Sequence, residues 1–175
     1  MRAIISNQRG MTLVEVMLAV AILGVGLVAL SSAVPLAAYG IQEGNQLSTS
    51  TFLANQRLEQ VRNAQWQAAQ PPAPATTIVA AIDRLGKSDP STAAPVGDGG
   101  AVTFADESPM GAPYAGYTRT VRITDCGTGA GCDGTVYANL RQVTVTVSYR
   151  PMTGIGMASS GTTTSAIVTM YIAQR

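Results

Sequence analysis

The titratable residues of this 175-residue chain support little catalytic chemistry. The sequence has no histidine, which excludes a Ser-His-Asp or Cys-His nucleophile and a His-ligated metal site. Its two cysteines cannot build a four-cysteine zinc site. The formal net charge of +1 argues against an electrostatic nucleic-acid binder. We therefore expect no enzymatic activity, no metal, no cofactor and no nucleic-acid partner.

One carboxylate nevertheless lies where it requires a partner. Glu15 is the only charged residue in the apolar run from Met11 to Ala38. A carboxylate in hydrocarbon costs about 2.5–3.5 kcal/mol on insertion scales. Cleavage of the bond between Gly10 and Met11 would create an α-amino group about one helical turn away, in the same chain or in a neighbouring one. The alternative is that the Glu15 side chain only reaches the membrane interface.

The segment that carries Glu15 is long enough to cross a membrane. Val16 to Ala38 is uncharged and meets the length of about 20 residues that a transmembrane helix needs. Arg2 and Arg9 make the preceding segment basic, which predicts a cytoplasmic N-terminus and a head outside the membrane. The apolar run is too long for an ordinary cleaved secretory signal. A buried core helix is the alternative.

The run Arg-Gly-Met-Thr-Leu-Val-Glu-Val-Met that begins at Arg9 resembles the class III signal of type IV pilins and pseudopilins. The resemblance implies a leader at residues 1–10, removed after Gly10 by a prepilin peptidase, and N-methylation of Met11. It also implies that residues 11–38 form a helix that spans the inner membrane and later packs into a filament. Met11 departs from the phenylalanine that the family most often has at this position.

The resemblance also assigns roles inside this helix. Glu15 would pair with the N-terminal amine of another subunit and fix the axial register between the two chains. Pro35 removes one backbone hydrogen bond, and Gly24 and Gly26 lower the helical propensity. Because this stretch can unwind in filaments of the family, we expect a helix break between Gly24 and Pro35. The alternative is a simple proline kink, with the glycines serving close helix packing.

Residues 39–70 are expected to continue the helix into the head as an amphipathic segment. Apolar and small residues at alternating i+4 and i+3 spacing form one face, which indicates packing against a sheet. This face consists of Leu47, Thr51, Ala54, Leu58 and Val61. The opposite, polar face consists of Gln56, Glu59, Gln60, Asn63 and Gln67. The proline-rich residues 71–74 would end the helix.

Residues 71–175 are expected to complete the head with loops and an antiparallel sheet. The stretch 75–115 is loop-like, with a short helix at 77–85. Its charged residues are expected to be solvated; they are Asp83, Arg84, Asp98, Asp106 and Glu107. Alternating side chains predict strands at 117–123, 142–149 and 166–172, the third more buried than the other two. A long helix followed by strands predicts an α+β fold, which matches the pilin architecture.

The two cysteines, Cys126 and Cys132, enclose a glycine-rich turn between the first two predicted strands. A disulfide closing this loop would stabilise the head by about 2.4 kcal/mol in the loop-entropy model. Such a bond fits an oxidising compartment outside the inner membrane. Two free thiols are the alternative.

Residues 15–17, 24–30 and 140–149 resemble minor pilins of the PilV kind, the type IV pilus modification proteins. The resemblance implies a single-pass inner-membrane protein with a periplasmic head that later reaches the cell-surface pilus. Its implied partners are the prepilin peptidase, other minor pilins, the major pilin, the inner-membrane assembly platform and membrane lipid. Three alternatives stay open: an I-type minor pseudopilin of type II secretion, a major pilin, and a bitopic envelope protein whose head binds a ligand.

Overall fold

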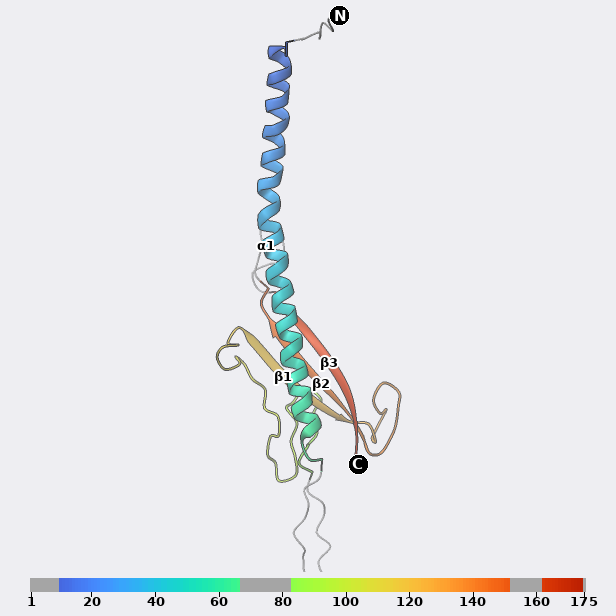
Figure 1. Ribbon diagram of the computed structural model, residues 1–175. Helices are drawn as coiled ribbons and strands as arrows, with labels where there is room; N and C mark the ends of the chain where they lie inside the picture. Colours follow the sequence, from blue (N-terminus) through green and yellow to red (C-terminus); the bar gives the residue numbers. More distant parts are fainter. Residues whose placement is uncertain (1–9, 67–82, 152–161, 175) are drawn as a thin grey trace, which may run out of the picture. The chain divides into compact units, whose positions relative to one another are not determined.

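The computed structural model describes residues 10–66, 83–151 and 162–174, and the chain divides into two compact units, residues 1–42 and 43–175. Helix α1 (Leu13–Asn63) is followed by strands β1 (Tyr117–Asp125), β2 (Leu140–Tyr149) and β3 (Thr164–Ala173) (Figure 1). The strands form one antiparallel sheet in the order β1-β2-β3. The predicted α+β class, a long apolar N-terminal helix followed by an antiparallel sheet, is confirmed.

Helix α1 is continuous, so the break expected between Gly24 and Pro35 is not present in the isolated chain. Pro35 has no N–H and deprives the Ser31 carbonyl of its usual donor, which is a loss of one hydrogen bond. Each glycine costs about 1 kcal/mol relative to alanine. These losses are small against the hydrogen bonds of a 51-residue helix. Unwinding of this stretch in a filament stays a prediction.

The helix ends earlier than predicted, at Asn63 rather than at Gln70. The Ala64 N–H donates to the Val61 carbonyl at 3.1 Å, an i−3 bond of the kind that tightens a last helical turn. Two residues later the chain bonds to the head, because the Trp66 carbonyl accepts the Arg84 N–H at 3.1 Å. The proline-rich residues 71–74 lie outside the described part of the chain.

The buried face of the head helix is rotated relative to the predicted one. Leu47 and Thr51 are exposed, whereas Ser50 and Leu53 are fully buried. The prediction was correct for the rest of the face, which is Ala54, Leu58 and Val61. The Ser50 hydroxyl donates to the Leu47 carbonyl at 2.8 Å, so a polar side chain is satisfied inside the core.

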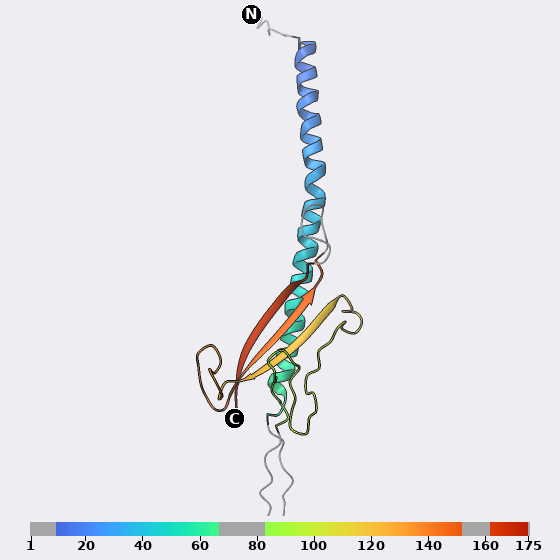
Figure 2. The same cartoon turned by 180° about the vertical axis from the view of Figure 1, so that it is seen from behind.

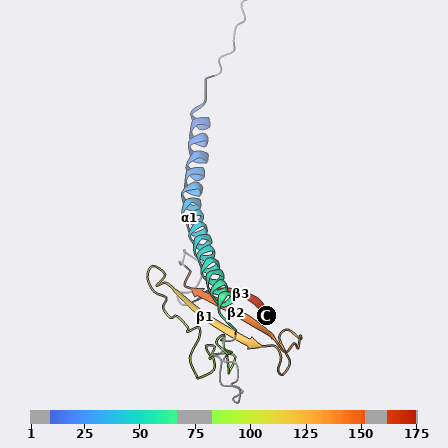
Figure 3. The same ribbon diagram turned by 60° about the horizontal axis from the view of Figure 1, so that its bottom comes forward.

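The sheet packs one face against these turns of α1 (Figures 2 and 3). Register is unbroken along both strand pairs, from Tyr117 opposite Tyr149 and from Leu140 opposite Ala173. Burial alternates along β1 and β2, as predicted for strands with one face toward the core. The buried side chains of the sheet that meet the helix are Val121, Ile123, Val143, Val145 and Val147.

The third strand was expected to be the most buried, and this was wrong. β3 is an edge strand in which Ala166 alone is buried, and Ile167 is 64% exposed. β1 is also an edge strand, yet three of its side chains are buried and the preceding loops bond along its outer edge. No described loop bonds along the outer edge of β3. Burial therefore depends on which distant segments cover a strand, which the local pattern does not contain.

The loop region before β1 contains three isolated bridges. Two lie within the loop and pair Lys87 with Val96 and Val96 with Val102, and the third joins the loop to β1 by pairing Glu107 with Arg119. Leu85 and Met110 are buried and extend the hydrophobic core. The short helix expected at 77–85 falls mostly outside the described residues, and residues 83–85 are not helical.

Candidate functional site

The Gly10–Met11 bond lies in exposed, irregular chain directly before helix α1. An ideal Cβ added to Gly10 would meet no atom within 4 Å, and the backbone there is outside the left-handed region. Among the described residues, neither space nor conformation therefore requires glycine at position 10. The bond itself is exposed in this part of the chain.

Thr12 caps the helix. The Glu15 N–H lies 3.0 Å from the Thr12 carbonyl oxygen and 3.3 Å from its Oγ1, and the Val16 N–H donates to the same carbonyl at 3.2 Å. Thr12 and Glu15 therefore occupy the positions of a capping box, in which a threonine precedes an acidic residue by three positions. Thr12 was not among the predicted site residues, although the Thr-x-x-Glu spacing is the local signal that identifies such a cap.

The capping position does not remove the need of Glu15 for a cation. A carboxylate in the first helical turn gains about 0.3–1 kcal/mol from the helix dipole. That gain is smaller than the cost of about 2.5–3.5 kcal/mol for a carboxylate in hydrocarbon. Glu15 is exposed, and it forms no ion pair within the described residues. A cation supplied by another chain, or by the new N-terminus, is still required if this turn enters hydrocarbon.

The N-terminal unit exposes apolar side chains around the whole helix. α1 contains a window long and apolar enough to cross a membrane, and none of that window is buried within the protein. Leu13 and Val25 are 75% and 73% exposed. Cβ atoms added to Gly24 and Gly26 would also meet nothing within 4 Å. Lipid or other subunits must therefore cover this surface, because exposed apolar patches of such size are unfavourable in water.

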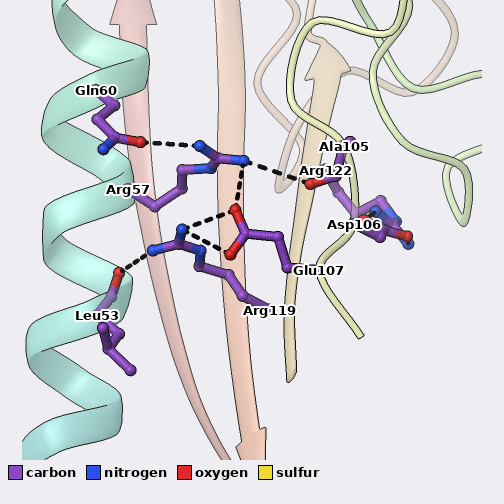
Figure 4. A network of polar contacts seen from close by, with 8 residues as sticks. All are labelled: Leu53, Arg57, Gln60, Ala105, Asp106, Glu107, Arg119 and Arg122. Carbon is purple, nitrogen blue, oxygen red and sulfur yellow. Dashed lines mark hydrogen bonds and ion pairs between the residues drawn. The ribbon is translucent and has the colours of Figure 1, made fainter. Parts of the chain in front are cut away.

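In the head, Glu107 joins helix α1 to strand β1 (Figure 4). Both of its carboxylate oxygens accept hydrogen bonds from Arg119 Nη2 at 2.9 Å, and Oε1 also lies 3.1 Å from Arg57 Nη2. Arg119 Nη1 donates to the Leu53 carbonyl at 3.2 Å, which places the guanidinium against the helix. Burial, followed by repulsion from Arg119, lowers the pKa of Arg57, and the Glu107 carboxylate opposes this shift.

A second ion pair fixes the opposite end of the sheet. Arg141 donates to the Asp83 carboxylate at 2.6 and 2.9 Å, and its guanidinium lies 4.5 Å from the centre of the Trp66 ring. Burial alone would raise the pKa of Asp83. The bonds from Arg141 and from the N–H groups of Gly86 and Leu85 outweigh burial, so the pKa is lowered.

The loop charges were expected to be solvated, which holds for the exposed Arg84, Asp98 and Asp106. It is wrong for Asp83 and Glu107, which are half-buried against arginine side chains. Asp106 accepts from Arg122 at 2.6 and 2.8 Å, which chiefly accounts for the lowered pKa of its carboxyl. Asp98 accepts the Asp83 N–H at 2.7 Å. With the pairs of Asp83 and Glu107, these acids position the loops on the head and are structural.

Cys126 and Cys132 form the disulfide, with their Cα atoms 4.9 Å apart. Gly131 in this loop has φ +71, and a Cβ there would lie 2.1 Å from the Thr135 carbonyl oxygen. The loop continues to Asp133, whose carboxylate accepts bonds from Tyr171 and Gln142 on the sheet. The cross-linked loop is therefore bonded to the exposed face of β2 and β3.

The sequence comparisons concern the N-terminal segment. Residues 5–31 match the family model described as the prokaryotic N-terminal methylation motif. No curated protein and no solved structure matches the chain. The motif is a type IV pilin-like prepilin signal, and together with the apolar helix it indicates a membrane-anchored structural protein processed by a prepilin peptidase. Within the described residues, no cluster of three or more acidic or cysteine side chains is suited to a metal ion.

Proposed function

We propose that this chain is a minor type IV pilin. One observation carries the proposal: an exposed Gly10–Met11 bond immediately precedes a capped helix whose membrane-length apolar segment has no buried residue. The match of residues 5–31 to the methylation motif supports the same assignment. The leader is removed after Gly10, Met11 is N-methylated, and the head lies in the periplasm until the subunit enters the pilus.

Cleavage supplies the cation that Glu15 lacks. The new α-amine at Met11 and the Glu15 carboxylate each carry a desolvation cost in hydrocarbon, and the two costs offset one another when the groups meet. Pairing between two chains occurs at one axial offset only, because each helix has one amine and one carboxylate in its apolar segment. Glu15 thereby sets the register in which the subunit joins other minor pilins, the major pilin or the assembly platform.

Replacement of Glu15 tests this role. The substitution Glu15→Ala is expected to leave membrane insertion intact and to reduce incorporation into sheared pili by at least about tenfold, because the amine then lacks a counter-charge. The matched control is Glu59→Ala, which removes a carboxylate whose side chain is 59% exposed on the head. Equal incorporation of the two variants would contradict the proposed pairing.

Replacement of Gly10 tests processing separately. Since no described residue would meet a Cβ at this position, Gly10→Phe is expected to fold normally and to block leader removal. The smaller change Gly10→Ala serves as the control for a general effect of losing glycine. Each variant is coexpressed with the peptidase and weighed by mass spectrometry. A leader-sized mass loss from Gly10→Phe equal to that of the unchanged chain would refute the recognition of Gly10.

A minor pseudopilin of type II secretion is the second candidate, favoured by the same methylation motif. The Glu15 mechanism is common to both candidates. Fractionation distinguishes them, since a minor pilin is recovered with sheared surface pili and a pseudopilin stays with the envelope. A bitopic envelope protein with a ligand-binding head would retain residues 1–10.

A further inference from the structure

The two edges of the sheet are treated differently by the fold. Along β1, the N–H and C=O groups that point away from β2 belong to alternate residues that include Tyr117, Arg119 and Ile123. Both backbone groups of each residue are bonded to the preceding loops. Tyr117 bonds to Tyr114 and Met110. Arg119 exchanges two bonds with Glu107, and Ile123 bonds twice to Ser88. The Val121 carbonyl accepts from Arg122 at 2.7 Å. Most of this edge is therefore occupied by the protein's own groups, which closes it to strand pairing.

The outer edge of β3 is open among the described residues. The Gln174 N–H donates to the Asn139 carbonyl at 2.9 Å, so the backbone groups of residue 174 point toward β2. In an antiparallel pair the direction alternates from residue to residue, so the even-numbered residues from 174 back to 164 point toward β2. The groups pointing outward belong to Ser165, Ile167, Thr169, Tyr171 and Ala173. No described residue bonds to these outward groups. Figure 2 shows β3, in red, as the outermost strand.

The usual protections of an edge strand are missing from β3. Proteins discourage edge pairing with lysine, proline, bulges or very short strands. β3 has ten residues in unbroken register, with neither a proline nor a charged residue. The residues whose backbone groups face the open edge include Ile167, which is 64% exposed, and Tyr171, which is 45% exposed. Among the described residues, one edge of the sheet is covered by loops and the other is regular, uncharged and open, which presents a surface for strand addition.

We propose that the outer edge of β3 binds an extended, uncharged strand from a different polypeptide. A row of alternating donors and acceptors at strand spacing is satisfied by another extended backbone. Partner side chains would lie beside Ile167 and Tyr171 on the outer face and beside Val168 and Met170 on the core face. These neighbours favour β-branched or aromatic partner residues and disfavour charged ones.

A second copy of the chain does not fit this edge. Its β1 edge is closed by its own loops, so head-to-tail pairing of β3 with β1 is blocked. Pairing of two β3 edges is antiparallel and relates the heads by a two-fold axis normal to the sheet. Residues 43–63 of the two helices would then run in opposite directions, although both chains are anchored in the same membrane by the same end. The inference otherwise rests on the head alone.

Amide hydrogen exchange on the full chain in detergent tests the proposal. The probe is a capped synthetic peptide of alternating threonine and valine. At saturating peptide, the exchange of the amides at 167, 169 and 171 is expected to slow by at least about tenfold, with no change at Val145 in the central strand. The variant Thr169→Pro removes an N–H that points away from β2 and should abolish the protection, whereas Thr169→Ala keeps that N–H and should retain it.

Four outcomes overturn the proposal. They are no slowing with peptide, equal responses of Thr169→Pro and Thr169→Ala, amides at these positions already protected in the free chain, and protection that rises with protein concentration without peptide. The last result would assign the edge to a second copy. If Thr169→Pro does not fold, Ile167→Lys replaces it, because a lysine on the edge disfavours pairing while leaving the β2 ladder intact. Peptide binding by that variant as tight as by the unchanged chain would equally refute the proposal.

Discussion

The substitution Glu107→Gln removes the negative charge shared by two guanidinium groups at the junction of α1 and β1. The side chains of Arg119 and Arg57 are 7% and 15% exposed, whereas that of Glu107 is 30% exposed. With glutamine, Arg119 keeps its bond to the Leu53 carbonyl and loses its ionic partner. Two like charges then face each other in a mostly buried environment.

The expected cost follows from this burial. Breaking a buried ion pair by removing one partner costs about 3–5 kcal/mol. The partial exposure of Glu107 allows water to screen the charges, and the glutamine oxygen still accepts one bond, so we expect a loss of about 2–3 kcal/mol. The matched control is Glu59→Gln on helix α1, which also carries Arg57. Its pair with Arg62 is 59% and 60% exposed, and the expected loss is below about 0.5 kcal/mol.

Urea unfolding in detergent, followed by tryptophan fluorescence, measures both variants. Trp66 is the single tryptophan of the chain and lies against Arg141, so its emission reports the packing of the head. Because no other tryptophan contributes, the signal is insensitive to the membrane segment. A free energy of unfolding for Glu107→Gln within about 0.5 kcal/mol of that for Glu59→Gln would refute the structural role of this network.

The remaining predictions use the same unfolding measurement. Reduction of the disulfide is expected to lower the stability of the head by about 2.4 kcal/mol, and an unchanged midpoint would show that the loop contributes no constraint. The pKa values of Asp83 and Asp106 are lowered on folding, so their ionised carboxylates stabilise the head fully above the ordinary pKa of about 3.9. This stabilisation is lost as pH falls through the folded-state values, and a urea midpoint that stays constant down to pH of about 3 would contradict it. Gly131→Ala is expected to cost at least about 2 kcal/mol from steric contact and a positive φ, and Gly129→Ala, with a positive φ and open space, about 1 kcal/mol. Equal losses would show that the contact at Gly131 is relieved.

The apolar N-terminal helix and its prepilin-like motif were predictable because their signals are local, and the methylation motif matches the same region. Processing at Gly10 and pairing of Glu15 stay predictions. The alternation in β1 and β2 was sufficient to predict strands facing a core. Nothing local, however, contains the order of strands in a sheet. The edge position of β3 was therefore missed.

The ion pairs of the head were missed for a related reason. Asp83 and Arg141 are 58 positions apart in the sequence, and Arg57 contacts a loop nearly as distant. An acid in a proline- and glycine-rich loop has the same local pattern whether it faces water or a buried arginine. The buried face of α1 was misplaced because Ser50 lies inside the core with its hydroxyl bonded to its own helix. The spacing had placed Thr51, rather than its neighbour Ser50, on the buried face.

Mass spectrometry of the N-terminal peptide, from membranes and from sheared pili together, tests whether the chain is a processed pilin. We expect a peptide that begins at Met11 and carries one methyl group on its α-amine, present in both fractions. Recovery of a chain that retains residues 1–10 in membranes, with none in the pili, would contradict the claim.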